Sequence, residues 1–179
     1  MFATPNIALI ALGTSFFLAI TLATRLHFKS VSMSAGMMAI SFLSACGICN
    51  FCWQVFEAVN YSAVSAVLIC TAWLLFISAI LATRSKNLKL AFDHHGTPQE
   101  IVTSGPFRYL RHPFYTSYVI FWAGCALAAL NTAGFIFPGL LLAFYIRAAR
   151  SEEQFLEKSD LSAQYQDYKS QLSWPWSRP

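Results

Sequence analysis

Five runs of apolar residues dominate this sequence and restrict what it can fold into. Each is long enough, or nearly so, to cross the hydrocarbon core of a bilayer as a helix, which takes roughly 20 residues. The runs cover residues 7–24, 35–56, 62–82, 114–130 and 133–149. The chain is 56% hydrophobic and only 11% charged, a balance that is wrong for a soluble domain of this size. The sequence therefore predicts an all-α, polytopic membrane protein with five transmembrane helices in a single domain, residues 1–179, in which residues 1–83 form three N-terminal spans.

The last two apolar runs are joined only by Asn131 and Thr132. This spacing predicts a short antiparallel helical hairpin near the C-terminus, with Pro138 tolerated because neighbouring helices can cover the freed carbonyl. After the hairpin, apolar and aromatic residues recur at steps of three, four or more, which predicts an amphipathic C-terminal helix lying on the protein or on the membrane surface. These residues are Phe155, Leu161, Tyr165, Tyr168 and Leu172. The terminal Trp174-Pro-Trp176 is typical of an interfacial anchor.

The basic residues predict how the chain is oriented in the membrane. If all five runs cross, the twelve Lys and Arg residues fall on one side, and the connections at 57–61 and 131–132 carry none. The positive-inside rule then places the N-terminus outside and the C-terminus in the cytoplasm. Basic residues dispersed along membrane flanks indicate contact with membrane lipids and argue against a nucleic-acid partner. The lack of a long soluble domain favours a bacterial inner membrane over the endoplasmic reticulum of a eukaryote.

Two patterns resemble metal sites, but neither predicts one. Cys46, Cys49 and Cys52 follow each other in steps of three, which drift around a helix, and no His or carboxylate in that span completes a ligand set. We expect the cysteines to be small, buried packing residues. His94 and His95 are adjacent, so their side chains would rarely face one ion, and no third ligand is placed. Hydrogen bonding in the loop, or contact with the edge of a bound cofactor, is the expected role of this pair.

A polar segment, Gly105-Pro-Phe-Arg-Tyr-Leu-Arg-His-Pro-Phe-Tyr115, immediately precedes the fourth apolar run. Pro113 suits the first turn of a helix, where its missing N–H would have no partner in any case. Arg111 and His112 would then lie at a helix N-terminus, where free N–H groups and the helix dipole favour an anion. Arg111 adds a forked cationic donor suited to a carboxylate or phosphate. The alternative is that Arg108, Arg111 and His112 only anchor this helix end to lipid headgroups.

A second polar segment, Arg147-Ala-Ala-Arg-Ser-Glu-Glu153, ends the fifth run. Paired carboxylates beside a membrane helix oppose the field of an anionic leaflet unless they meet a cation. Arg147 and Arg150 could be that cation at helical spacing. The functional alternative is a cationic or polyhydroxyl ligand, such as a sulfonium cofactor with its ribose hydroxyls. Because the hairpin joins the two polar segments, we expect Arg111 and His112 to meet Glu152 and Glu153 at one membrane surface.

These motifs, in this order, resemble the isoprenylcysteine carboxyl methyltransferase family of integral membrane enzymes. The resemblance covers roughly residues 84–172 and rests on Gly105-Pro-x-Arg-Tyr-x-Arg-His-Pro-x-Tyr115, the hairpin, Glu152-Glu153 and the pair Tyr165 and Tyr168. The wider group includes phospholipid N-methyltransferases and small-thiol methyltransferases. The resemblance implies S-adenosylmethionine as methyl donor, a cytoplasmic cofactor pocket built by residues 84–179, and an opening toward the bilayer for a lipophilic acceptor.

The resemblance also implies roles for individual residues. His112, Pro113 and Tyr115 correspond to the cofactor-binding part of the first motif, to which we add Arg108. Arg111 corresponds to the family arginine near the methyl acceptor, so Arg111 and His112 are the expected catalytic residues. Glu152 and Glu153 correspond to the acidic pair that helps to hold the cofactor. The chain departs from the family at Leu161-Ser162, where a Phe-Gly pair is usual, and its N-terminal spans carry no matching motif.

The resemblance implies transfer by direct displacement, in which the acceptor heteroatom attacks the sulfonium methyl group in line. A carboxylate acceptor would need no base and would be oriented by Arg111. An amine or hydroxyl acceptor would need one, with His112 or a glutamate as the candidate.

Two other functions stay open at this point. One is an NADPH-dependent membrane reductase of the steroid or sterol reductase type, which shares the Arg-His-Pro-x-Tyr region but usually has more or longer spans. The Glu152-Glu153 pair favours the methyl donor over the dinucleotide. The other is a non-catalytic membrane scaffold, in which Glu152→Ala and Arg111→Ala would change neither cofactor binding nor cellular function.

Overall fold

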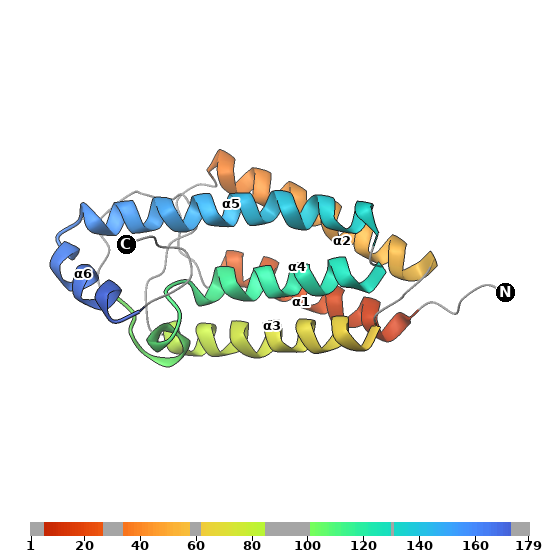
Figure 1. Cartoon of the computed structure of the whole chain (residues 1–179), viewed down its shortest axis with the longest axis horizontal. Coiled ribbons are helices and arrows are strands. Elements are labelled where there is room, and N and C mark those ends of the chain that lie inside the picture. The colour runs from red at the N-terminus through yellow and green to blue at the C-terminus, as the bar shows by residue number, and fades with distance from the viewer. Residues whose placement is uncertain (1–5, 27–33, 58–61, 85–100, 130, 173–179) are drawn as a thin grey trace.

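The computed structural model describes residues 6–26, 34–57, 62–84, 101–129 and 131–172. Within these ranges every regular element is a helix, which confirms the all-α prediction. The elements are α1 (Ile7–Leu26), α2 (Ala35–Glu57), α3 (Ser62–Thr83), the 3-10 helix η1 (Gly105–Arg108), α4 (Pro113–Ala129), α5 (Thr132–Glu157) and α6 (Ser162–Ser170). The five long helices lie side by side, and α6 lies at the end of the bundle that also holds η1 (Figure 1).

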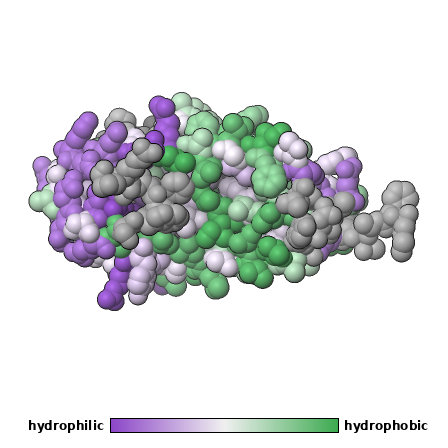
Figure 2. Space-filling view, in the orientation of Figure 1, coloured by the Kyte–Doolittle hydropathy of each residue, from purple (hydrophilic) through white to green (hydrophobic). Residues whose placement is uncertain are grey.

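Four helices of the described chain, α1, α2, α3 and α5, are long and apolar enough to cross a membrane. Apolar residues cover the middle of the bundle, and hydrophilic residues gather at the end that carries α6 (Figure 2). Helix α4 is apolar but has 17 residues, so it is slightly shorter than a full span. These features identify an integral membrane protein, and the fifth crossing stays a prediction.

The helix starts agree better with the sequence than the helix ends do. Helix α4 begins at Pro113, as its ring geometry predicts. Helix α5 begins after Asn131, whose side chain accepts a hydrogen bond from the Gly134 N–H at 2.9 Å. However, α5 continues to Glu157, well beyond the apolar run that ends at residue 149. Arginine, alanine and glutamate are strong helix formers, so the backbone stays helical where the hydropathy falls. The second polar segment is therefore an extension of a membrane helix.

The hairpin helices are sequential neighbours, but α4 packs more extensively against α3 than against α5. Gly124 permits this close approach, because a Cβ atom there would come within 3.0 Å of the Ile69 side chain. Helix α5 packs instead chiefly on α2, where the Asn50 side chain donates a hydrogen bond to the Ala133 carbonyl at 3.2 Å. Helix α4 is thus held between α3 and α5, which fixes where its N-terminus points.

The core of the bundle is aromatic. Phe16 of α1 is fully buried, and its ring lies 4.6 Å from that of Phe121 and 5.3 Å from that of Trp73. The cysteines contribute less to packing than expected: Cys125 is buried, but Cys49 and Cys70 are exposed on the outer surface of the bundle. A short thiol side chain faces outward there at no great cost, because the surrounding surface is itself apolar.

The predicted amphipathic pattern of the tail is divided between two helices. Phe155 belongs to α5, and Tyr165 and Tyr168 belong to the nine-residue α6. The two tyrosines and Leu172 are buried in a small second core, against Ile101 and Leu156. Helix α6 therefore lies on the protein itself. The predicted anchor 174–176 is outside the described residues.

Candidate active site

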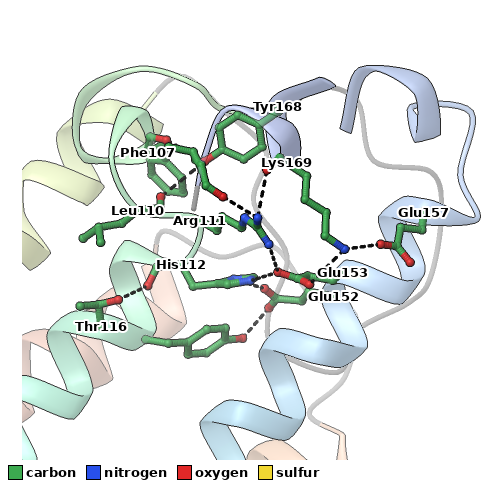
Figure 3. A network of polar contacts seen from close by, with 12 residues as sticks. Phe107, Leu110, Arg111, His112, Thr116, Glu152, Glu153, Glu157, Tyr168 and Lys169 are labelled. Atoms are coloured by element: carbon green, nitrogen blue, oxygen red, sulfur yellow. Dashed lines mark hydrogen bonds and ion pairs between the residues drawn. The ribbon is translucent and has the colours of Figure 1, made fainter. Parts of the chain in front are cut away.

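Polar side chains from three elements meet at the end of the bundle that carries α6 (Figure 3). Arg111 and His112 come from the residues just before α4, Glu152 and Glu153 from the end of α5, and Lys169 from the last turn of α6. Arg111 Nη1 lies 3.8 Å from Glu153 Oε1, and His112 Nε2 lies 3.1 Å from the same oxygen. The two polar segments of the sequence therefore meet, as their positions at the two ends of the hairpin predicted.

His112 lies between the two acids. Its Nε2 is within hydrogen-bond distance of Glu153, and its Nδ1 is 3.7 Å from Glu152 Oε2. Burial alone would lower the pKa of His112, but hydrogen bonding to Glu152 and Glu153 and the charges of both raise that pKa to about 9. Carboxylates only accept hydrogen bonds, so the doubly protonated ring is the form that suits both neighbours. At neutral pH His112 is therefore a cation and a proton donor.

Arg111 is tied to the C-terminal end of α6. Its Nη2 donates hydrogen bonds to the carbonyl oxygens of Lys169, at 2.9 Å, and of Leu172. The Lys169 carbonyl also accepts a hydrogen bond from the Leu172 N–H, so Arg111 reinforces a turn that is already closed. The negative end of the α6 dipole favours a cation in this position. The Nε and Nη1 atoms of Arg111 are buried and have no hydrogen-bond partner within the described residues. Arg111 therefore holds the tail through Nη2, while its Nε and Nη1 groups make no hydrogen bond to any described residue.

Glu153 is buried among three basic groups. Besides Arg111 and His112, Lys169 Nζ lies 3.8 Å from Glu153 Oε2. Lys169 also forms an ion pair of 2.7 Å with Glu157, one turn further along α5. No motif in the sequence marks Lys169 as a site residue. Its only signal was a basic residue in the last turn of a short amphipathic helix, which is usually a solvated position.

Glu152 is the more accessible acid, with a side chain that is 35% exposed. It accepts a hydrogen bond of 2.5 Å from the Tyr115 hydroxyl. Tyr115 lies on α4, so this bond joins the first turn of α4 to the end of α5. The tyrosine that the sequence marked as a motif residue thus contacts the predicted acidic pair directly.

The alternative partners of the acids, Arg147 and Arg150, are both exposed on α5. The ion pairs of Glu153 are made with other elements, so the local pairing that helical spacing allowed is not observed. The reason is that Glu153 points into the bundle, whereas the two arginines lie on the outward face. Arg108 is also exposed, on η1, and makes no hydrogen bond or ion pair with any described part of the chain.

The backbone before Arg111 is held by two contacts. Gly105 has φ +59°, and a Cβ atom there would come within 2.9 Å of the Ala82 side chain, so the turn against α3 requires glycine. The Tyr168 hydroxyl donates a hydrogen bond of 2.7 Å to the Phe107 carbonyl. Together they hold the segment between α3 and α6.

The described residues include no group of three or more His, Cys, Asp or Glu side chains that could hold a metal ion. Asp93, His94 and His95 lie outside those residues. Of the remaining predicted site residues, the structure brings together Arg111, His112, Tyr115, Glu152 and Glu153. Pro113 is buried as the first residue of α4.

The profile of the phospholipid methyltransferase family matches residues 59–159, a range that includes α3, α4, all of α5 and both polar segments. No curated protein and no solved structure matches significantly.

Proposed function

This chain belongs to the phospholipid methyltransferase family of integral membrane methyltransferases, and from that membership we propose that it uses S-adenosylmethionine to methylate a lipophilic acceptor. The isoprenylcysteine carboxyl methyltransferases belong to the same group. The observation that carries the proposal is the meeting of His112 and Glu153 at 3.1 Å. It joins the two family motifs, which are 41 positions apart in the sequence, into one buried polar cluster.

The chemistry of the cluster fits the proposed cofactor. Glu152 and Glu153 are acceptors suited to ribose hydroxyls and to an ammonium group. His112, Pro113, Tyr115 and, at the exposed edge, Arg108 complete the proposed cofactor-binding set. When bound, S-adenosylmethionine supplies a methyl group activated by the positive charge on its sulfur.

The protonation state of His112 limits which chemical classes of methyl acceptor it could activate as a base. A cationic imidazole between two carboxylates cannot take a proton from an incoming nucleophile at neutral pH. A carboxylate acceptor needs no base, neither His112 nor a glutamate. We therefore propose an isoprenylcysteine-type carboxylate or a related lipid acid, while an amine or hydroxyl acceptor would need Glu152 or Glu153 as its base. The Nε and Nη1 groups of Arg111, which make no hydrogen bond to any described residue, would orient that carboxylate, and His112 would hold the acidic pair in place.

The proposed acceptor enters from the bilayer, since the exposed surface of the bundle is largely apolar. The basic residues support a cytoplasmic location for the cluster and an external N-terminus, in a bacterial inner membrane or, in a eukaryote, in the endoplasmic reticulum. The partners proposed are thus a lipophilic acceptor and membrane lipids, and no nucleic acid.

The cofactor is tested by calorimetric titration of the detergent-purified protein with S-adenosylhomocysteine and, separately, with NADPH. We expect S-adenosylhomocysteine to bind, and we expect Glu152→Ala to raise its dissociation constant at least tenfold. Asp160→Asn is the matched control, because it removes an exposed carboxylate just beyond α5. Binding of NADPH alone would identify a reductase, and unchanged binding in Glu152→Ala would contradict the proposed site.

The acceptor is tested with membrane extracts incubated with isotopically labelled S-adenosylmethionine, with and without the protein. Mass spectrometry should find one newly labelled lipid that carries a methyl ester. Base treatment should release the label from an ester and leave it on an amine. A labelled amine would contradict the carboxylate assignment while keeping the methyltransferase.

A further inference from the structure

Two helical faces meet directly beneath the polar cluster. Tyr115 and Trp122 lie two turns apart on α4, and Tyr145 and Glu152 lie two turns apart on α5, so each pair shares one face of its helix. The Tyr115 hydroxyl donates to Glu152, and the Trp122 indole N–H donates to the Tyr145 hydroxyl at 3.2 Å. Between the two bonds the rings of Tyr115 and Tyr145 stack, with centroids 5.9 Å apart and planes inclined by 25°. We call these four residues the α4–α5 clasp.

Only one end of the clasp is accessible. Trp122 is 3% exposed and Tyr145 is 4% exposed, whereas the Glu152 side chain is 35% exposed. Helix α2 closes the other end, because a Cβ atom at Gly47 would come within 2.9 Å of the Trp122 ring. Trp122 and Tyr145 therefore lie too deep to touch a ligand held by the acidic pair.

The clasp fixes the register of α5 against α4. Sliding α5 by one turn would break both hydrogen bonds at once and leave the buried Trp122 N–H without its acceptor. A buried donor without an acceptor is costly, so the two helices are held at one height. Glu152 lies on α5, so its position relative to His112 depends on the axial position of α5 against α4.

We propose that Tyr145 and Trp122 are positioning residues that hold Glu152, through Tyr115, where it binds the cofactor. This inference rests on the proposed function, because Glu152 is the proposed cofactor ligand. It adds two residues from the buried part of the bundle to a site otherwise made of residues at its polar end.

The test is a double-mutant cycle on the dissociation constant of S-adenosylhomocysteine, measured by titration of the full chain in detergent. Tyr145→Phe and Tyr115→Phe each keep the ring and remove a hydroxyl. We expect each to raise the dissociation constant about three- to tenfold, in the range measured for coupled contacts. Because both act through the same link to Glu152, the double variant should bind no more weakly than Tyr115→Phe alone. Independent, multiplying losses would overturn the proposal.

Controls separate positioning from simple stability. The Tyr118 ring packs on those of Tyr115 and Tyr145, with centroids 6.3 and 5.5 Å away, but its hydroxyl takes no part in either bond of the clasp. Tyr118→Phe should leave the dissociation constant unchanged. All titrations are made well below the melting temperature of each variant, so weaker binding cannot come from unfolding.

If Tyr145→Phe melts earlier but binds as tightly as the wild type, its role is structural and the inference is wrong. Trp122→Phe, which removes the donor at the other end of the bond, is the second probe and should weaken binding in the same way. A wild-type protein that binds no S-adenosylhomocysteine would instead contradict the proposed function.

Discussion

Glu153→Gln should destabilise the protein strongly, because Glu153 is a buried acid that faces three basic groups. Its oxygens lie 3.1 Å from His112 and 3.8 Å from both Arg111 and Lys169. Glutamine keeps the size of the side chain and can still accept a hydrogen bond, so the substitution removes the charge and little else. The side chains of Arg111 and His112 are only 6% and 8% exposed. Hydration of these two cations therefore cannot compensate for the loss of the Glu153 charge.

The magnitude follows from the pKa of His112. Its rise from the usual 6.5 to about 9 corresponds to about 3 kcal/mol of favourable interaction with the imidazolium form. Glu152 and Glu153 share that interaction, so about half is lost with Glu153, and the buried guanidinium of Arg111 adds about 1 kcal/mol. We expect Glu153→Gln to lower the free energy of unfolding by about 2–3 kcal/mol.

The assay is thermal unfolding in detergent, followed by tryptophan fluorescence, since Trp122 is buried. A loss of this size corresponds to a melting temperature lower by roughly 5–10 °C. The matched control is Glu157→Gln. Glu157 makes a shorter ion pair, 2.7 Å to Lys169, but the two side chains are 33% and 24% exposed. Water screens that pair, so its loss should cost less than about 1 kcal/mol.

The comparison separates burial from distance as the source of stability. If Glu157→Gln destabilised as much as Glu153→Gln, the shorter contact would matter more than the buried one and the reasoning would be refuted. The penalty of Glu153→Gln should also shrink above pH 9, where His112 loses its proton.

Three further predictions concern pH and the backbone of the site. Folding raises the pKa of His112, so the stability that its protonated ring contributes is complete below about pH 6.5 and is lost as the pH rises through 9. His112→Asn should flatten this pH dependence of the melting temperature in scans from pH 6 to 10. Gly105→Ala should lower the free energy of unfolding by about 1–2 kcal/mol, because φ is +59° and the added methyl meets Ala82; an unchanged melting temperature would argue against this turn. Tyr168→Phe removes the bond to the Phe107 carbonyl and should cost about 1 kcal/mol in chemical unfolding, with no change in the pH dependence.

The sequence was most informative where a local rule applies. Proline at the start of a helix predicted the first residue of α4, and apolar runs predicted α1, α2 and α3 to within a few residues. The meeting of His112 with the acidic pair followed from the hairpin, because two helices joined by a two-residue connection must return to one surface.

The features that could not be predicted from the sequence depend mainly on the direction in which a side chain points. Helical spacing alone allowed Arg150 to pair with Glu153, but the helix presents them on different faces, and only packing determines which face is inward. The apolar run predicted an end near residue 149, but α5 continues to Glu157. Hydropathy indicates which residues suit the membrane interior, and a helix can continue beyond it. Lys169 and Tyr145 carry no motif, since their roles come from contacts between segments far apart in the sequence.

The hydrogen bonds from Arg111 to the carbonyls of Lys169 and Leu172 have a consequence for biosynthesis. A ribosome makes Arg111 some sixty residues before the two acceptor carbonyls, and these are translated only after α1 to α5 are complete. The cluster is therefore completed last, once the tail has left the exit tunnel and folded back. Nascent chains halted before residue 169 should insert into the membrane and yet remain inert.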